Sequence, residues 1–222
     1  MRFARHLASP RRCSVFLRQA LSDDTVGQIL IDIDSPGGSV YGVAELADQI
    51  QAARSQKPVV AIANSLAASA AYWLGCAASE FYVTPGGEVG SIGVWQAHFD
   101  YSQAIASEGV KPTLISAGKY KVEGNPYEPL NDEARGFMQS RVDDYYGAFT
   151  KAVAKGRGMP IASVRDGLGQ GRVLGADAAV AQKMVDGIST FDDVIAAMQK
   201  RTRSQNRSAN RLARARNALA LM

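Results

Sequence analysis

The chain of 222 residues is long enough for one α/β domain with terminal extensions, and 46% of its residues are apolar, which can supply a substantial core. No apolar run approaches the roughly 18 residues of a membrane span, and the basic N-terminus lacks the continuous apolar segment of a signal peptide. Two cysteines, Cys13 and Cys76, are too few for a disulfide framework or a zinc site, so a reducing cytoplasm is the expected location.

The net charge of +4 conceals an asymmetry along the chain. Residues 1–22 contain five arginines and no acidic residue, and residues 194–222 contain seven basic residues and no acidic one, so the middle of the chain is acidic. The sequence predicts a domain over residues 23–198 between a basic N-terminal arm, residues 1–22, and a basic C-terminal tail, residues 199–222. Basic arms can bind nucleic acid or acidic proteins, but without interleaved aromatic residues solvated tails are the favoured interpretation.

The first part of the chain alternates apolar runs with helical patterns. A short helix is expected over residues 14–22, and nearly continuous apolar residues predict a buried strand over residues 26–33. A helix over residues 40–53, a strand over residues 58–63 and a second helix near Ser69 follow. This alternation predicts parallel βαβ units with right-handed crossovers.

The remainder of the chain has shorter patterns. Strands are expected over residues 80–83, 90–95 and 111–116, the second of these as a strand or a bend, and helices over residues 99–107 and 176–183 and from residue 192 onward. A further helix should begin after Asn131, a favourable N-cap that is followed by two acidic residues. An apolar stripe runs along this helix as far as Val153, and such a stripe is more typical of a core or an interface than of a cofactor site.

Two turns follow neighbouring strands of the predicted parallel sheet and should therefore share one edge of it. The first turn contains Gly37 and Gly38, and the second contains Ser69 between small residues. Glycines let backbone amides approach a ligand, and a serine at a helix start can present its hydroxyl to a cleft while the next amide faces a developing oxyanion. The pattern indicates a nucleophile site, with a tightly packed small-residue helix as the alternative. A Walker loop is excluded because its lysine and spacing are absent.

A serine nucleophile needs a base, and the residues alone leave several candidates open. His6 lies in the basic arm, and His98 follows a predicted strand. A lysine made neutral by burial is the other type of base. Lys121 follows a strand and a glycine, and Lys119 and Lys111 compete with it, although each lysine is by its chemistry first a solvated surface charge.

Several motifs occur together and in order along the chain. Residues 34–41 read DSPGGSVY, residues 65–72 read SLAASAAY, residues 90–94 read GSIGV and residues 118–121 read GKYK. With this combination the sequence resembles the signal peptide peptidase A family of serine–lysine peptidases, which includes phage capsid-maturation proteases. Segments at residues 156–159 and 171–173 match as well, so the resemblance extends over about residues 24 to 198.

The resemblance implies an α/β fold of the Clp/crotonase type, with repeated βαβ units around a mainly parallel sheet. The implied reaction is peptide hydrolysis through an acyl-enzyme, without a metal or a cofactor. The roles that the resemblance assigns are nucleophile for Ser69, general base for Lys121, proton relay for Ser91 and oxyanion hole for the amides of Gly37 and Ala70, with Gly38 adjacent.

The sequence departs from the family pattern at both ends. Family members have strands before the position of Val26, where this chain has the basic arm, and this leaves open that the sheet lacks its N-terminal strands. The membrane anchor of the cellular enzymes is absent, and the basic tail is not part of the peptidase core. These departures favour a phage or prophage head-maturation protease, in the host cytoplasm or in a virion precursor, over a membrane-bound signal peptide peptidase.

The expected partners are a peptide or protein substrate, with capsid, scaffold and portal proteins as candidates, and further copies of the chain, because family members form rings. Nucleic acid is a weaker candidate partner, through the basic arms. Two other functions stay open: a non-catalytic capsid assembly or scaffold module, and a crotonase-like acyl-CoA enzyme. No segment suggests a CoA pocket, and an acyl-CoA enzyme would leave the pair of Ser69 and Lys121 unexplained.

Overall fold

The structure, a computed structural model, describes residues 9–220, and for residues 205–206 and 208–220 only the helical backbone. His6 and the first two arginines of the basic arm lie outside the described residues. The chain forms two compact units, one comprising the chain up to Gly93 and again from Phe149 onward, and the other comprising residues 94–148. The predicted boundaries of the basic arm and the basic tail stay predictions.

The first unit is built on one six-stranded sheet, as far as the described residues go. Its strands are β1 (Ile29–Ser35), β2 (Val59–Ala68), β3 (Glu80–Val83), β4 (Glu88–Gly90), β5 (Val173–Gly175) and β6 (Gly187–Ile188). β1 pairs with β2 on one side, and β3 and then β4 pair with β2 on the other, all in parallel. β6 extends the sheet beyond β3 in parallel, and β5 pairs antiparallel with β4. The predicted α/β fold with a mainly parallel sheet is confirmed.

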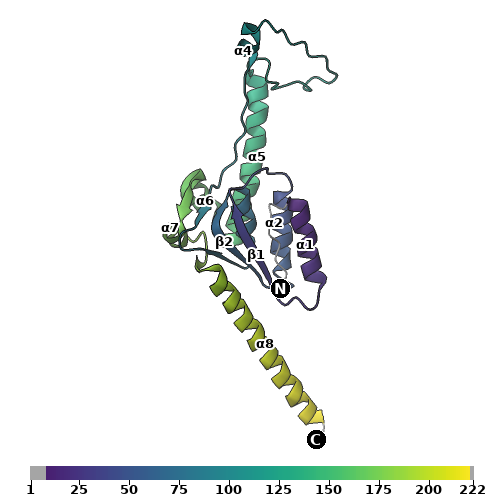
Figure 1. Cartoon of the computed structure of the whole chain (residues 1–222), viewed down its shortest axis with the longest axis vertical. Helices are drawn as coiled ribbons and strands as arrows, with labels where there is room; N and C mark the ends of the chain where they lie inside the picture. Colours follow the sequence, from purple (N-terminus) through teal and green to yellow (C-terminus); the bar gives the residue numbers. More distant parts are fainter. Residues whose placement is uncertain (1–8, 221–222) are drawn as a thin grey trace. The chain divides into compact units, whose positions relative to one another are not determined.

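Helices cover both faces of this sheet. They are α1 (Pro10–Ser22), α2 (Val43–Ala53), α3 (Ala70–Gly75), the C-terminal part of α5 (Asp132–Arg157), α6 (Ile161–Asp166), the 3-10 turn η1 (Leu168–Gly171), α7 (Ala176–Ala181) and α8 (Phe191–Ala220). α1 and α2 lie side by side (Figure 1), joined by a hydrogen bond of 2.5 Å from Ser14 Oγ to Gln49 Oε1. The first helix starts at Pro10, earlier than predicted, because proline suits the first helical position.

The burial of the central strand β2 explains why its residues from Val59 to Ala63 are all apolar. Val60 and Ile62 are fully buried and pack against Val194 and Met198 of α8. Successive side chains of a strand point to opposite faces, so the equally buried Ala61 faces the other side of the sheet. A strand that is covered on both faces needs apolar residues at every position. The strand predicted to be buried over residues 26–33 differs: β1 begins at Ile29, and only its Ile33 is buried.

The start of α8 is fixed to the sheet by polar contacts. Gln28 Nε2 donates to the Met198 carbonyl oxygen at 2.8 Å and to Thr202 Oγ1 at 2.7 Å. The Arg201 guanidinium binds both carboxylate oxygens of Glu80. The basic tail therefore begins inside a helix that is anchored to the sheet. Within the described part of the chain, no helix combines the length and the apolarity that crossing a membrane requires.

The second unit contains α4 (Ser102–Ser107) and the N-terminal part of α5. The predicted strand over residues 111–116 is wrong: these residues are exposed and have neither helix nor strand. β-branched residues alone do not make a strand, because a strand also needs a neighbour to pair with. The apolar stripe of α5 is shared between the two units. Phe149 is buried in the first unit, whereas Phe137 of the second unit is 59% exposed.

Candidate active site

Ser69 occupies the turn between β2 and α3 in a strained conformation. Its backbone has φ 54° and ψ −124°, a region that residues with a side chain rarely adopt. Its N–H donates to the Gly90 carbonyl oxygen at 2.8 Å, and its own carbonyl oxygen accepts a hydrogen bond from Trp73 N at 3.0 Å. The strand on one side and the helix on the other thus hold the strained turn in place. Strain of this kind is typical of functional residues, including the nucleophile of serine hydrolases.

Gly37 lies directly against this turn. A Cβ atom on Gly37 would stand 2.7 Å from Ser69 Cβ and 3.0 Å from the amide nitrogen of Ala70. Gly37 N donates to Ser35 Oγ at 3.2 Å, whereas a Cβ on Gly38 would meet no atom within 4 Å. The fold therefore brings the predicted oxyanion-hole residues Gly37 and Ala70 together beside Ser69, with Gly38 next to them and more exposed.

Ser91 is brought to the same edge by β4. Gly90 pairs with Ala68, the residue before Ser69, and Ser91 follows Gly90 directly. Ser91 also has a left-handed backbone, with φ 53°, and its N–H donates to the Arg172 carbonyl oxygen at 2.8 Å. The two serines therefore sit at the ends of paired strands. Ser91 was expected inside a strand or bend over residues 90–95, but β4 ends at Gly90.

A third strained serine was not singled out in the sequence. Ser65 has φ 92°, and its N–H donates to Thr84 Oγ1 at 3.2 Å. It marks the point at which β2 changes its partner from β3 to β4. The register of β1 against β2 also shifts close to this point, after Ile33. The sequence signal was a serine in the middle of an otherwise small and apolar strand, and this is too common to identify a bend.

The helix that follows Ser69 is held by buried side chains on its far side. Tyr72 is fully buried, and its hydroxyl donates to the Met184 carbonyl oxygen at 3.0 Å. Trp73 stacks on Phe149 of α5, with ring centroids 4.7 Å apart and planes 5° from parallel. Burial raises the pKa of the Cys76 thiol to about 12, so this cysteine is a neutral packing residue.

An ion pair between the shielded side chain of Arg157 and the exposed Asp186 lies close to α3. Arg157 at the end of α5 donates to both carboxylate oxygens of Asp186, at 3.1 and 2.8 Å, and to the Lys183 carbonyl oxygen at 3.0 Å. Asp186 Oδ2 also accepts a hydrogen bond of 2.7 Å from Phe81 N. Burial tends to raise the pKa of Asp186, but the hydrogen bonds from Arg157 and Phe81 outweigh it and hold the pKa below the ordinary value. Asp186 is therefore charged at neutral pH.

Lys121 lies in the second unit, on an exposed turn in which its N–H donates to the Gly118 carbonyl oxygen at 3.2 Å. Ser69 belongs to the first unit, so the pairing of Lys121 with Ser69 stays a prediction from the sequence.

The competing lysine Lys119 is occupied by other groups. Its ammonium donates to the Tyr120 hydroxyl at 2.7 Å and lies 3.4 Å from Glu133 Oε1, which also accepts a hydrogen bond of 3.0 Å from Tyr120. The hydrogen bond with Tyr120, followed by that with Glu133, raises the pKa of Lys119. Lys119 therefore stays protonated, which argues against it as a general base. The third lysine considered, Lys111, is exposed.

His98, the candidate histidine base, also belongs to the second unit. Its Nε2 lies 2.9 Å from the carbonyl oxygen of Asn125, and a carbonyl can only accept, so Nε2 carries the hydrogen. Its imidazole lines a hollow that is described below. No group of three or more His, Cys, Asp or Glu side chains in the described residues is arranged to bind a metal ion.

A strained serine at a strand-to-helix turn, beside a glycine backbone and the first amide of a helix, is an arrangement that serine hydrolases use. The sequence pattern of Peptidase family S49 matches residues 51–205. The chain therefore belongs to Peptidase family S49, and the resemblance found in the sequence is confirmed.

Individual relatives agree with this assignment. The chain is 39% identical to the capsid assembly protease C of Escherichia phage lambda, over 82% of this chain and 41% of that protein. It is 38% identical to the head-tail preconnector protein GP5 of Enterobacteria phage P21, over 82% of this chain and 36% of that protein. It is 28% identical to a putative signal peptide peptidase SppA of Enterococcus faecium, over 83% of this chain and 54% of that protein. The chain thus spans well under half the length of the two phage proteins.

Proposed function

We propose that the chain is the peptidase domain of a serine endopeptidase in which Ser69 is the nucleophile and Lys121 is the general base. The observation that carries this proposal is the strained backbone of Ser69, at φ 54°, with Gly37 packed against it. A fold retains strain where the surrounding structure enforces it, and such sites are typically functional. Membership of Peptidase family S49 supports the same reaction class.

In the proposed reaction, neutral Lys121 takes the proton of the Ser69 hydroxyl while the oxygen attacks the carbonyl carbon of the scissile peptide bond. The oxyanion that forms accepts hydrogen bonds from the Ala70 amide and from the glycine turn. Collapse of this intermediate expels the amine, which receives the proton from Lys121 and leaves an acyl-enzyme. Water then attacks the ester, with Lys121 again as the base. Ser91 holds the lysine and relays protons to it.

The glycine turn offers two donors for the oxyanion hole. Gly37 N donates a hydrogen bond to Ser35 Oγ at 3.2 Å, and this bond must break before the amide can bind the oxyanion. The Gly38 amide, in the exposed part of the same turn, is the second donor.

We infer a role in the maturation of phage or prophage heads, because two relatives are a capsid assembly protease and a head–tail preconnector protein. The substrates would then be capsid, scaffold or portal proteins, and the active form an oligomer. A cellular signal peptide peptidase activity is the alternative within the same family. An assembly or scaffold module is a second candidate function, favoured by the basic helix α8 that extends to Ala220. The basic residues in its sequence would contact capsid proteins or, less favourably, nucleic acid.

Labelling with a fluorophosphonate tests the nucleophile. We expect the wild-type protein to be labelled at Ser69 and the Ser69→Ala variant to remain unlabelled. Ser65→Ala is the matched control, because Ser65 is exposed and also has a left-handed backbone. A wild-type protein without label, or a Ser69→Ala protein labelled like the wild type, would contradict the proposal. Assembly of heads that survives Ser69→Ala but fails on deletion of residues 199–222 would favour the scaffold function.

A further inference from the structure

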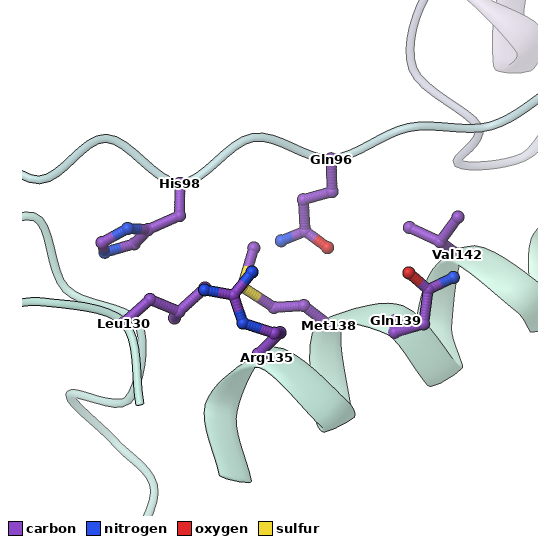
Figure 2. Close-up of a pocket in the computed structure, with 7 residues that line it drawn as sticks. All are labelled: Gln96, His98, Leu130, Arg135, Met138, Gln139 and Val142. Atoms are coloured by element: carbon purple, nitrogen blue, oxygen red, sulfur yellow. The ribbon is translucent and has the colours of Figure 1, made fainter. Parts of the chain in front are cut away.

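The second unit contains a hollow that the proposed hydrolysis does not use. It has a volume of about 290 Å³ and lies between α5 and the segment that carries Gln96 and His98. Figure 2 shows these two side chains pointing from that segment toward α5. Its lining residues are Gln96, His98, Leu130, Arg135, Met138, Gln139 and Val142, all within residues 94–148.

Arg135 gives this hollow a permanent positive charge. A guanidinium stays protonated at every relevant pH, and no acidic residue is among the seven lining residues. In the described part of the chain, no carboxylate forms an ion pair with Arg135. The nearby acidic residue Glu133 already binds Tyr120 and Lys119, so it is not free to neutralise Arg135. The charge is thus available to an anionic ligand.

The rest of the lining restricts the size and the polarity of that ligand. Leu130, Met138 and Val142 provide apolar surface, which suits methylene groups better than a fully hydrated ion. Gln139 donates a hydrogen bond of 2.8 Å from its Nε2 to Asp143 Oδ1, so this amide is already engaged. The Gln96 amide is a further hydrogen-bond donor. One guanidinium with one amide fits a single carboxylate, whereas a doubly charged phosphate would call for more cations.

The backbone beside the hollow is open to an extended peptide. Residues 94–100 have neither helix nor strand, and their backbone N–H groups have no hydrogen-bond partner in the described part of the chain. An exposed extended segment of this kind can pair with a peptide through main-chain hydrogen bonds. A side chain of such a peptide would then enter the hollow on the side where Gln96 and His98 lie.

We propose that the hollow around Arg135 binds a peptide carboxylate, either on the methylene stem of a glutamate or aspartate side chain or at a C-terminus, where the last side chain supplies the apolar group. The guanidinium binds the two carboxylate oxygens in a bidentate manner, and the stem packs on Leu130, Met138 and Val142. The site selects acidic protein segments as ligands. Binding requires neither Ser69 nor Lys121, so the proposal stands or falls independently of the proposed hydrolysis.

The test measures peptide binding to the full chain carrying Ser69→Ala, so that no peptide is cleaved. Trp95 adjoins Gln96 and is 82% exposed, whereas the other tryptophan, Trp73, is 2% exposed. A soluble quencher therefore reaches Trp95 and not Trp73, and a change in the quenched part of the tryptophan fluorescence reports on this site. Three acetylated tripeptides are compared: alanyl-glutamyl-alanine amide, alanyl-glutaminyl-alanine amide, and alanyl-glutaminyl-alanine with a free C-terminal carboxylate. The first and third distinguish a side-chain carboxylate from a C-terminal one.

We expect saturable binding of at least one carboxylate peptide and about tenfold weaker binding of the neutral glutamine amide. Arg135→Gln should lower the affinity for the carboxylate peptide to that for the neutral peptide. Arg141→Gln is the matched control, because Arg141 lies on the same helix but pairs with Asp144 at 2.8 Å outside the hollow. Equal binding of all three peptides, no saturable binding, or the same loss in both arginine variants would overturn the proposal. Circular dichroism of each variant verifies that the fold persists.

Discussion

Gly37 lies so close to Ser69 that a side chain on Gly37 would overlap the serine turn. A Cβ atom on Gly37 would stand 2.7 Å from Ser69 Cβ and 2.7 Å from the Ala68 carbonyl oxygen. Gly37 also has φ +97°, in the region that favours glycine. The glycine turn after β1 and the serine turn after β2 therefore form one packed unit. The strain at Ser69 is held partly by the glycine that would also help to bind the oxyanion.

We predict that Gly37→Ala lowers the free energy of unfolding by about 1–3 kcal/mol, because the new methyl group overlaps backbone and side-chain atoms. Displacement of the turn should also abolish fluorophosphonate labelling at Ser69. Urea denaturation and labelling measure the two effects. Gly86→Ala is the control, because a Cβ on Gly86 meets no atom within 4 Å. Similar stability losses in both variants would show that the close packing at Gly37 does not matter.

Ser69→Gly should make the protein inactive but more stable. The conformation at φ 54° and ψ −124° costs a residue with a side chain about 1–3 kcal/mol, while glycine adopts it freely. After the larger entropy loss of glycine, a net gain of roughly 1 kcal/mol is expected in the free energy of unfolding. Ser69→Ala keeps the strain and removes the same hydroxyl, so it should show no such gain. A gain of equal size in both variants would rule out strain as its source.

The two neighbouring lysines should respond differently to substitution. Lys121→Ala is expected to lower the rate of peptide cleavage about 100-fold or more, the usual contribution of a general base, while the circular dichroism spectrum is unchanged. Lys119→Ala removes only the exposed contacts with Tyr120 and Glu133, so most activity should remain. Cleavage that withstands Lys121→Ala but not Lys119→Ala or His98→Ala would assign the base to one of those residues.

Asp186→Asn should destabilise the protein by about 2–3 kcal/mol at neutral pH, because it leaves the Arg157 guanidinium, only 7% exposed, without its partner charge. The pKa of Asp186 is lower in the folded protein than its ordinary value of 3.8. Its stabilising contribution is therefore complete above that value and is lost as the pH falls through the folded-state pKa.

Urea denaturation of wild type and Asp186→Asn between neutral and acidic pH measures this contribution. The stability difference between the two proteins should narrow as the pH falls. Asp144→Asn is a matched control at an exposed ion pair with Arg141, and we expect it to cost less than about 1 kcal/mol. A difference that stays constant down to acidic pH would contradict the assignment of the pH dependence to Asp186.

Much of the first unit could be predicted from the sequence because its signals are local. The apolar run of β2, the Pro36-Gly37-Gly38 turn and the position of Ser69 after a strand are properties of short segments. Their order along the chain implies a parallel sheet, and a parallel sheet brings turns at the ends of neighbouring strands to one edge. The contact of Gly37 with the Ser69–Ala70 turn follows from that topology.

Tertiary structure decided what depends on partners far apart in the chain. Residues 111–116 contain apolar and β-branched residues, yet without a neighbouring strand they remain irregular. Arg157 is a structural cation because folding places Asp186 beside it, and Lys119 is paired because Glu133 begins the next helix. Among the described residues, Arg135 has no such partner and lines a hollow instead. Sequence alone identifies each charged group, but the environment that sets its role forms only when distant segments meet.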